Sequence, residues 1–445
     1  MNRGLKKTCM YLASAAAFLL LLVACGSTTG DGGPGGPGGP KPGACTHTLS
    51  SDVISRVVLA PTGADCDYYL ARQINLKAEL VVMPGTRIVA AEGAMFRVED
   101  SGSVQAVGTA DERIEFVGEK AVLGSWYGFC FMGDHRESRF DHVDIVWAGG
   151  VYAVGVRLCR AGIAGSVSSG GEPVHVTNSL VLGAYTSGID ATRFTLGEFS
   201  NNVLAGHVEY GLRVSPSNAG RLDASTDYTG AGVVYGDGSS AANGRPYVFL
   251  ASEEQANTDG IQEWQDIGVP YYVTRDESPY ATSALNFESG TRTLIHAGVE
   301  IVIAEMGGGQ PGFWIVNDFA VLALAGEPGN EVVIRGEVDE PGVWEGIWMY
   351  GGGLIGEHAV IANAGRPSGL VMEAPITWDR VYGPTHCSHL RNVTIRNSPT
   401  YGVYIDEDYE PYVRLDDMSY EQIALVPQQV GAANGPAVLD GVDCE

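Results

Sequence analysis

The sequence runs through the same series of short apolar segments twice, in residues 76–128 and again in residues 294–346. The segments of the first copy are 80–88, 104–108, 114–118 and 126–129, and those of the second are 294–301, 321–324, 332–336 and 344–347. They are rich in β-branched residues, are bounded by glycines and lack a helical period, which is typical of strands joined by tight turns. The repetition predicts an all-β parallel solenoid with an internal duplication.

A finer repeat is marked by Asn178, Asn201 and Asn392, each followed nine positions later by a small or aromatic residue, a glycine and an aliphatic residue. The first two are 23 residues apart, a reasonable length for one coil. About a dozen such coils, each advancing by one strand spacing of ~4.8 Å, would form a body ~55–60 Å long. We expect the asparagine amides to form ladders at the turns. Trp126 and Trp344 recur at equivalent positions, which predicts a packing role for both.

The order of the motifs is similar to that of the right-handed parallel β-helix repeat proteins of bacterial envelopes. The resemblance covers about residues 66–420, and its motifs are an apolar run with Pro84-Gly-Thr-x-Ile, then Val104-x-Ala-x-Gly-Thr, Ile114-Glu-Phe and Gly124-Ser-Trp-x-Gly-Phe. The second copy departs from this pattern by having Ala297 at the position of the proline. The resemblance implies a right-handed parallel β-helix. Because this group includes polysaccharide lyases, pectin-type hydrolases, adhesins and lipoproteins, the fold alone does not choose a function.

Composition divides the chain into six segments. They are a signal (1–24), a Gly/Pro-rich tether (25–44), a first β-helix block (45–215), an irregular segment (216–267), a second β-helix block (268–420) and a C-terminal tail or cap (421–445). The tether is a flexible chain of modest reach. The irregular segment is polar and rich in turn residues, which indicates either an excursion from one coil or a junction between two blocks.

The N-terminal segment has a basic head and an apolar stretch of about 15 residues, which suits a secretory signal and is too short to span a bilayer. It ends in Leu22-Val-Ala-Cys25, followed by Gly26. This ending resembles the bacterial lipobox, which implies cleavage before Cys25 and a diacylglycerol on its sulfur. Glycine rather than aspartate at the next position implies, by the same analogy, no retention in the inner membrane. We expect a lipid-anchored protein of the cell envelope, held at the outer membrane.

The chain is strongly acidic, with a formal net charge of −26. Removal of the signal, which carries Arg3, Lys6 and Lys7 and no acid, makes the charge −29. Such a surface repels nucleic acid and anionic lipid, so we expect no nucleic-acid partner. Cationic partners and divalent ions are favoured instead.

Six cysteines remain after the signal and the lipidated cysteine are set aside, and an even number in an exported protein suggests disulfides. Proximity along the chain favours the pairs Cys45–Cys66, Cys130–Cys159 and Cys387–Cys444. Six cysteines allow 15 pairings, so other connectivities stay open.

Two groups of charged residues are candidates for chemistry. Arg139, Asp141 and Asp144 could serve a lyase or hydrolase, which needs a base and an acid near the sugar, although an outward ion pair beside a turn is the simpler interpretation. Asp406 and Asp408 could offer oxygens to Ca²⁺, although a solvated acidic turn explains them equally well. No other cofactor is expected.

The sequence lacks the ordered aspartate series of the pectin-type hydrolases, as well as a phosphate-binding loop and a nucleophile elbow. We therefore favour a non-enzymatic module that binds a glycan or a surface protein, or that serves as a scaffold. The alternative is a polysaccharide lyase or hydrolase that acts on envelope or environmental glycans.

Overall fold

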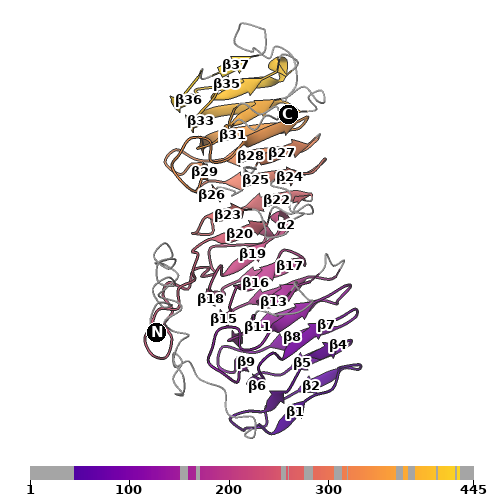
Figure 1. Cartoon of the computed structure of the whole chain (residues 1–445). Coiled ribbons are helices and arrows are strands. Elements are labelled where there is room, and N and C mark those ends of the chain that lie inside the picture. The colour runs from indigo at the N-terminus through magenta and orange to yellow at the C-terminus, as the bar shows by residue number, and fades with distance from the viewer. Residues whose placement is uncertain are drawn as a thin grey trace, which may run out of the picture.

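The computed structural model describes residues 45–430, apart from 151–158, 167–170, 252–256, 259, 275–283, 305–312, 318, 367–373, 379–385, 407–408 and 426–427. The described part is nearly all β, and its named strands pair in parallel. Figure 1 shows an elongated stack that runs from β1 (His47–Leu49) at the lower end to β37 (Gln428–Val430) at the upper end.

The N-terminal half of the stack is built from three sheets. Sheet A contains β1, β3 (Tyr68–Leu70), β6 (Arg87–Ala90), β9 (Ile114–Gly118), β12 (Val143–Val146), β15 (Leu180–Leu182) and β18 (Val203–Ala205). Sheet C contains β2 (Val57–Leu59), β5 (Glu79–Val82), β8 (Ser103–Val107), β11 (Ser138–Asp141), β14 (Val174–Thr177) and β17 (Leu196–Ser200). Sheet B begins with β4 (Ile74–Leu76), β7 (Met95–Val98), β10 (Gly128–Phe131), β13 (Ala161–Gly165), β16 (Ser187–Ala191) and β19 (Leu212–Val214).

The C-terminal half continues sheet B and adds sheet D. The main row of sheet B goes on through β20 (Val248–Ala251), β23 (Tyr271–Thr274), β26 (Glu300–Ile303), β29 (Val332–Gly336), β31 (Gly353–Ala362), β33 (Ser388–Ser398) and β36 (Ser419–Ile423). A second row contains β22 (Ile261–Trp264), β25 (Arg292–His296), β28 (Val321–Ala325) and β35 (Val413–Asp416), and the long strands β31 and β33 join the two rows. Sheet D contains β21 (Asn257–Thr258), β24 (Ala284–Phe287), β27 (Phe313–Asn317), β30 (Gly346–Tyr350), β32 (Ile376–Trp378), β34 (Val403–Ile405) and β37.

The chain visits the three N-terminal sheets in turn, so each strand pairs with strands about one circuit before and after it. Inward side chains thereby stack on their counterparts: Leu80 in β5 is in register with Val104 in β8, and Ile88 in β6 with Phe116 in β9. Most buried apolar residues form one continuous cluster from Val53 to Val413, and the others form three smaller clusters. The two halves therefore share a single core.

The second half of the sequence repeat is shifted by one sheet relative to the first. Ile88 and Ile301 occupy matching positions in the two copies, but Ile88 lies in sheet A and Ile301 in sheet B. The shift arises because sheets A and C end at β18 and β17, whereas β19 pairs directly with β20 across the junction.

Residues 215–247 form the junction. They begin with the short helix α2 (Pro216–Ala219), and Asp227 then pairs with Val203 at the end of sheet A. The Tyr235 ring stacks on buried Trp147, with 5.5 Å between ring centroids, so this loop covers part of the outer face of sheet A. Strands β20, β21 and β22 lie inside the range 216–267, so the irregular segment is shorter than its composition suggests.

Matching residues of the two copies make matching contacts. Trp126 and Trp344 are both buried, and their Nε1 groups donate to the carbonyls of Val146 (3.0 Å) and Ala362 (2.9 Å). The packing role predicted for the two tryptophans is confirmed. A Cβ added at Gly108 would meet the carbonyl oxygen of His142, and one added at Gly326 would meet that of His358. These two histidines occupy matching positions in the two copies.

The repeated asparagines lie at corners where the chain passes from one sheet to the next. Asn178, Asn201 and Asn392 have φ values of 52°, 54° and 53°. Asparagine is among the few residues that adopt this left-handed conformation readily, which explains its recurrence. The Asn178 amide donates to the Asp141 carboxylate (2.8 Å), and Asn392 lies 3.5 Å from the His358 ring. Corner geometry, more than an amide ladder, accounts for the repeat.

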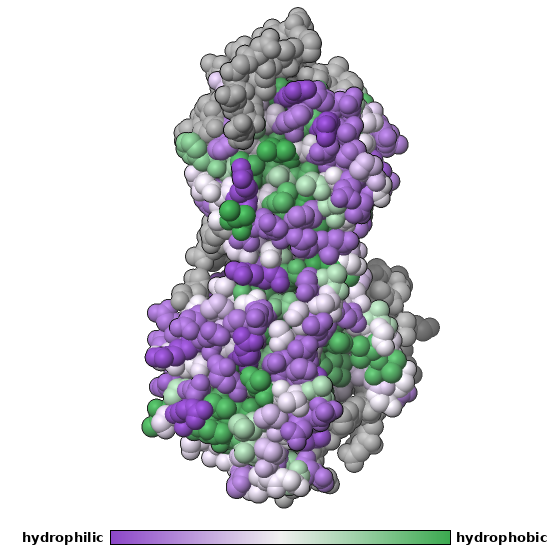
Figure 2. Space-filling model, turned by 180° about the vertical axis from the view of Figure 1, so that it is seen from behind, coloured by the Kyte–Doolittle hydropathy of each residue, from purple (hydrophilic) through white to green (hydrophobic). Residues whose placement is uncertain are grey.

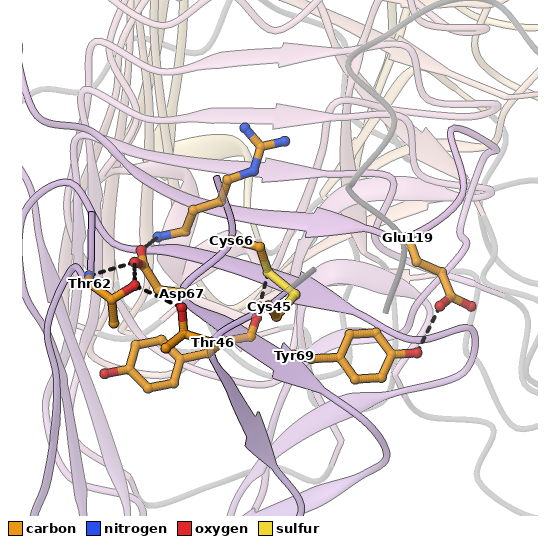
Figure 3. Close-up of a disulfide and its surroundings, with 9 residues drawn as sticks. Cys45, Thr46, Thr62, Cys66, Asp67, Tyr69 and Glu119 are labelled. Carbon is orange, nitrogen blue, oxygen red and sulfur yellow. Dashed lines mark hydrogen bonds between the residues drawn. A yellow bond between two sulfur atoms is a disulfide. The ribbon is translucent and has the colours of Figure 1, made fainter. Parts of the chain in front are cut away.

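A disulfide holds the N-terminal end of the stack in place (Figure 3). Cys45 bonds to Cys66, and the adjacent buried Asp67 accepts hydrogen bonds from the Thr62 hydroxyl (2.7 Å) and from the Arg87 backbone N–H (2.8 Å). The start of the described chain is thereby held against β3 and β6.

The other predicted disulfides involve the middle and the end of the chain. Cys130 bonds to Cys159, so both this pair and Cys45–Cys66 are pairs that proximity favoured. Cys387 is also disulfide-bonded, whereas Cys444 lies outside the described residues.

Candidate functional site

The outer face of sheet C is divided into two halves of different chemistry. Strand register aligns Val58, Val81 and Gln105 with Arg139 and His175 along the sheet. The half around β2, β5 and β8 carries the apolar residues Val58, Val81, Met83 and Val107 together with Gln105 and the exposed Arg56–Glu79 ion pair, and we call it the apolar half. The polar half comprises Arg139, Asp141, His175, Thr177, Glu198 and Ser200 on β11, β14 and β17. The polar half offers the chemistry for a ligand site.

A β-bulge distorts the last strand of this sheet. Val174 is opposite Leu196 and Val176 is opposite Phe199, so two residues of β17, Gly197 and Glu198, face one residue of β14. Bulges of this kind re-aim side chains and are frequent beside active sites. A Cβ at Gly197 would lie 2.5 Å from the His175 ring, so glycine is what lets this imidazole lie on the strand.

The His175 ring is fixed in one orientation by the bulge. Its Nδ1 accepts a hydrogen bond from the Glu198 backbone N–H (2.9 Å), so in the neutral ring the proton is on Nε2. Nε2 lies 3.4 Å from Oε1 of Glu137, and the side chain is 14% exposed. The neutral imidazole therefore points its Nε2–H donor toward the Glu137 carboxylate. The Glu198 carboxylate lies on the other side of the ring, 3.7 Å from Nδ1.

Arg139 belongs to the same group of side chains. Its guanidinium donates to Oε2 of Glu198 (2.7 Å), and the Glu198 side chain is largely exposed. The pair is too open to contribute much stability, but it holds the carboxylate beside the imidazole. We call Glu137, Arg139, His175 and Glu198 the His175 cluster.

A cavity of about 500 Å³ opens beside the His175 cluster at the end of sheet C. Its lining residues are Pro173, His175, Leu196, Gly197, Glu198, Phe199, Ser200, Arg221 and Asp223. The volume falls in the range of small-molecule sites, ~300–1,000 Å³. The lining combines carboxylates, an arginine, an imidazole and a hydroxyl with apolar surface, so it can donate and accept hydrogen bonds around one polar ligand.

Asp141 is engaged in the structure of a corner. The chain turns at His142, whose φ is 52°, so Asp141 ends β11 in sheet C and Asp144 lies in β12 in sheet A. The Asp141 carboxylate accepts hydrogen bonds from the Thr177 hydroxyl (3.0 Å) and the Asn178 amide (2.8 Å), and lies 2.9 Å from the His142 ring. These contacts hold three strand ends together.

Asp144 lies in sheet A, away from the cavity lining. Its Oδ1 accepts two hydrogen bonds from the Arg113 guanidinium, at 2.6 and 2.9 Å, and Arg113 also donates to the Asn178 carbonyl (3.0 Å). The structure therefore gathers Arg139 with the His175 cluster and leaves Asp144 in a separate ion pair. This arrangement agrees with the simpler interpretation of Asp144 as part of an outward ion pair.

The corner around Asp141 makes stability depend on pH. Burial alone would raise the pKa of Asp141, but the hydrogen bonds from Asn178 and Thr177 and the adjacent His142 lower it below its ordinary value. A carboxyl with a lowered pKa stabilises the fold above its unfolded-state pKa, and this contribution is lost as pH falls through the folded-state pKa.

We expect the wild-type free energy of unfolding to decrease below about pH 4, the usual pKa range of aspartate. The Asp141→Asn variant should lose this part of the dependence. Urea unfolding from pH 7 to pH 3 measures both proteins, and a variant whose pH dependence equals that of the wild type would contradict the assignment.

The predicted calcium ligands are only partly covered by the structure. Asp406 follows β34, and its carbonyl accepts the N–H of Tyr409 (2.9 Å), whereas Asp408 lies outside the described residues. Within the described ranges, no group of three or more His, Cys, Asp or Glu side chains is arranged to hold a metal ion. The same residues include no helix long and apolar enough to cross a membrane.

Three members of the His175 cluster were missed by sequence reasoning, because Glu137, His175 and Glu198 are far apart along the chain. One signal could have found two of them. His175 and Glu198 are separated by the same 23 residues as Asn178 and Asn201, so one coil length brings each pair together. Comparison of the chain with protein-family models, curated proteins and solved structures finds no match.

Proposed function

We propose that this protein is a lipid-anchored module of the bacterial cell envelope that binds a glycan at the cavity beside the His175 cluster. In this proposal the stack of sheets is a right-handed parallel β-helix with an internal duplication, which the cyclic strand order and the matched tryptophan contacts support. Cys25 carries the lipid, and residues 25–44 connect it to the body. The protein stands at the outer membrane.

The observation that carries the proposed binding site is the fixed imidazole at the edge of a cavity of suitable size. A sugar presents hydroxyls, which both donate and accept, and the cavity offers partners of both kinds: Glu198 and Asp223 accept, and Arg221 donates. Pro173 adds apolar surface for the C–H face of a sugar ring. Bound glycan would replace water at these groups without any movement of the strands that carry them.

A polysaccharide lyase or hydrolase is the second candidate, and the His175 cluster is the observation that favours it. An imidazole flanked by Glu137 and Glu198 contains the groups needed for general acid and base catalysis on a glycosidic bond. The enzyme would use Arg139 of the original candidates, whereas Asp141 and Asp144 are engaged in structural contacts. Turnover of a bound polysaccharide distinguishes this candidate from the binding module.

Glu198→Gln tests the proposed site, because it removes the negative charge while keeping the size of the side chain. Hydrogen bonds to charged groups contribute ~1.5–3 kcal/mol, so we expect the affinity for a retained glycan to fall about tenfold or more. The measurement is isothermal titration calorimetry with the glycan that the full chain retains best from a polysaccharide panel.

Asp144→Asn is the matched control, since it also neutralises one carboxylate but lies in the ion pair with Arg113. We expect its glycan affinity to equal that of the wild type. Equal affinities for wild type and Glu198→Gln would place the glycan elsewhere and overturn the proposed site.

A further inference from the structure

We propose that the apolar half of the sheet C face rests on the lipid surface of the membrane that carries the anchor. This inference relies on the proposed lipid anchor and adds an orientation of the body to it. Val58, Met83 and Val107 are 47%, 42% and 40% exposed, and Ile54, in the turn before β2, is 78% exposed. Met83 directly follows β5 and Val107 ends β8; the residues before them, Val82 and Ala106, are in register, so Met83 and Val107 lie side by side.

The position of this patch along the stack favours a lipid surface as its partner. Strands β2, β5 and β8 belong to the first coils, and the disulfide between Cys45 and Cys66 fixes the start of the body to the same end. Cys45 lies 20 positions after Cys25. A Gly-rich chain of that length has an end-to-end distance of about 25 Å, so the lipid anchor keeps this end of the stack near the bilayer.

The charge distribution points the same way. Residues 45–107, which carry the patch, contain seven acidic and five basic residues, so their formal charge is −2. The whole chain has a formal charge of −26. Anionic headgroups therefore repel the remainder of the body more strongly than this end, which favours the approach of this end to the lipid surface.

Figure 2 shows one side of the molecule, on which hydrophobic residues gather in several patches among hydrophilic ones. With the apolar half of sheet C against the lipid, the polar half and its cavity lean toward the headgroup layer. The glycan that the cavity meets first is then one displayed at the membrane surface.

The test compares two single substitutions, Met83→Trp in the patch and Val338→Trp in the second half of the chain. The two positions are 42% and 40% exposed, which makes them a matched pair. Six native tryptophans (Trp126, Trp147, Trp264, Trp314, Trp344 and Trp378) are buried, so they add little to quenching from the lipid. The full mature chains are reconstituted into phosphatidylethanolamine–phosphatidylglycerol vesicles containing brominated lipid.

An interfacial side chain lies ~5–10 Å deep at the headgroup–acyl boundary, so we expect quenching of the Met83→Trp chain to exceed that of the Val338→Trp chain at least about twofold. Equal quenching in anchored chains would overturn the proposed orientation while leaving the anchor intact. Mass spectrometry of the same preparation reports the lipid on Cys25. A mature chain without that lipid would overturn the anchor and the orientation together. Concentration-dependent dimers with unquenched Met83→Trp would assign the patch to a second copy of the chain and so contradict the proposal.

Discussion

Replacing Trp344 with alanine should lower the free energy of unfolding by about 3–5 kcal/mol, the usual cost of removing a large buried aromatic side chain. Trp344 is buried in the continuous core, its Nε1 donates to the Ala362 carbonyl (2.9 Å), and its ring lies 6.3 Å from that of Trp314. The substitution leaves a cavity in the core and removes the hydrogen bond to the Ala362 carbonyl. Guanidinium unfolding followed by far-ultraviolet circular dichroism measures the loss.

Tyr185→Ala is the control for this prediction, because Tyr185 is a large aromatic residue with about half of its surface exposed. We expect it to change stability by less than about 0.5 kcal/mol, as surface substitutions usually do. A Trp344→Ala protein as stable as Tyr185→Ala would show that the tryptophan does not pack between the coils.

Substituting Gly326 with alanine should destabilise the fold by at least about 3 kcal/mol, at or above the upper end of the cost of overpacking. The new Cβ would lie 1.9 Å from the His358 carbonyl oxygen and 2.9 Å from the Val332 backbone nitrogen. Both obstacles are backbone atoms, so neither can move aside by changing a rotamer, and the corner between β28 and β29 must open. The midpoint of thermal unfolding measures the effect.

Gly232→Ala is the matched control, because nothing lies within 4 Å of a Cβ at that position and its φ is outside the left-handed range. This variant should unfold at the temperature of the wild type or slightly above it, since alanine restricts the unfolded chain. If Gly326→Ala and Gly232→Ala unfold at the same temperature, the close approach at Gly326 is wrong.

The sequence predicts the all-β class and the duplicated series of strands because a stack of parallel strands repeats its requirements in every coil. Each coil needs inward aliphatic residues in register, as with Leu80 and Val104, and small residues where the backbone approaches a neighbour, as at Gly326. These requirements leave a periodic signal. The recurrence of Trp126 and Trp344 as core residues has the same origin.

The sequence could not predict the shift of the second copy by one sheet. The shift depends on how residues 215–247 close sheet A at Asp227 and let β20 pair with β19, which no local pattern encodes. For a similar reason, the sequence does not show that the segment around Arg139 is divided between two sheets. The left-handed conformation of His142 divides it, and histidine carries a weaker signal for that conformation than glycine does.

The candidate site was only partly predictable. Arg139 was identified from its neighbours in the sequence, but its partner Glu198 is 59 residues away. The His175 orientation depends on a bulge in β17, an irregularity that interrupts the strand pattern instead of repeating it. A site that depends on such an irregularity cannot be predicted from the periodic pattern of the sequence.

The central claim is that the cavity beside the His175 cluster binds a glycan without cleaving it. The most direct test incubates the full mature chain with a panel of polysaccharides, with and without Ca²⁺, and analyses the retained and released material by mass spectrometry. We predict that at least one polysaccharide is retained with its chain length unchanged under both conditions. Shortened chains or unsaturated ends would contradict the claim and assign the His175 cluster to catalysis.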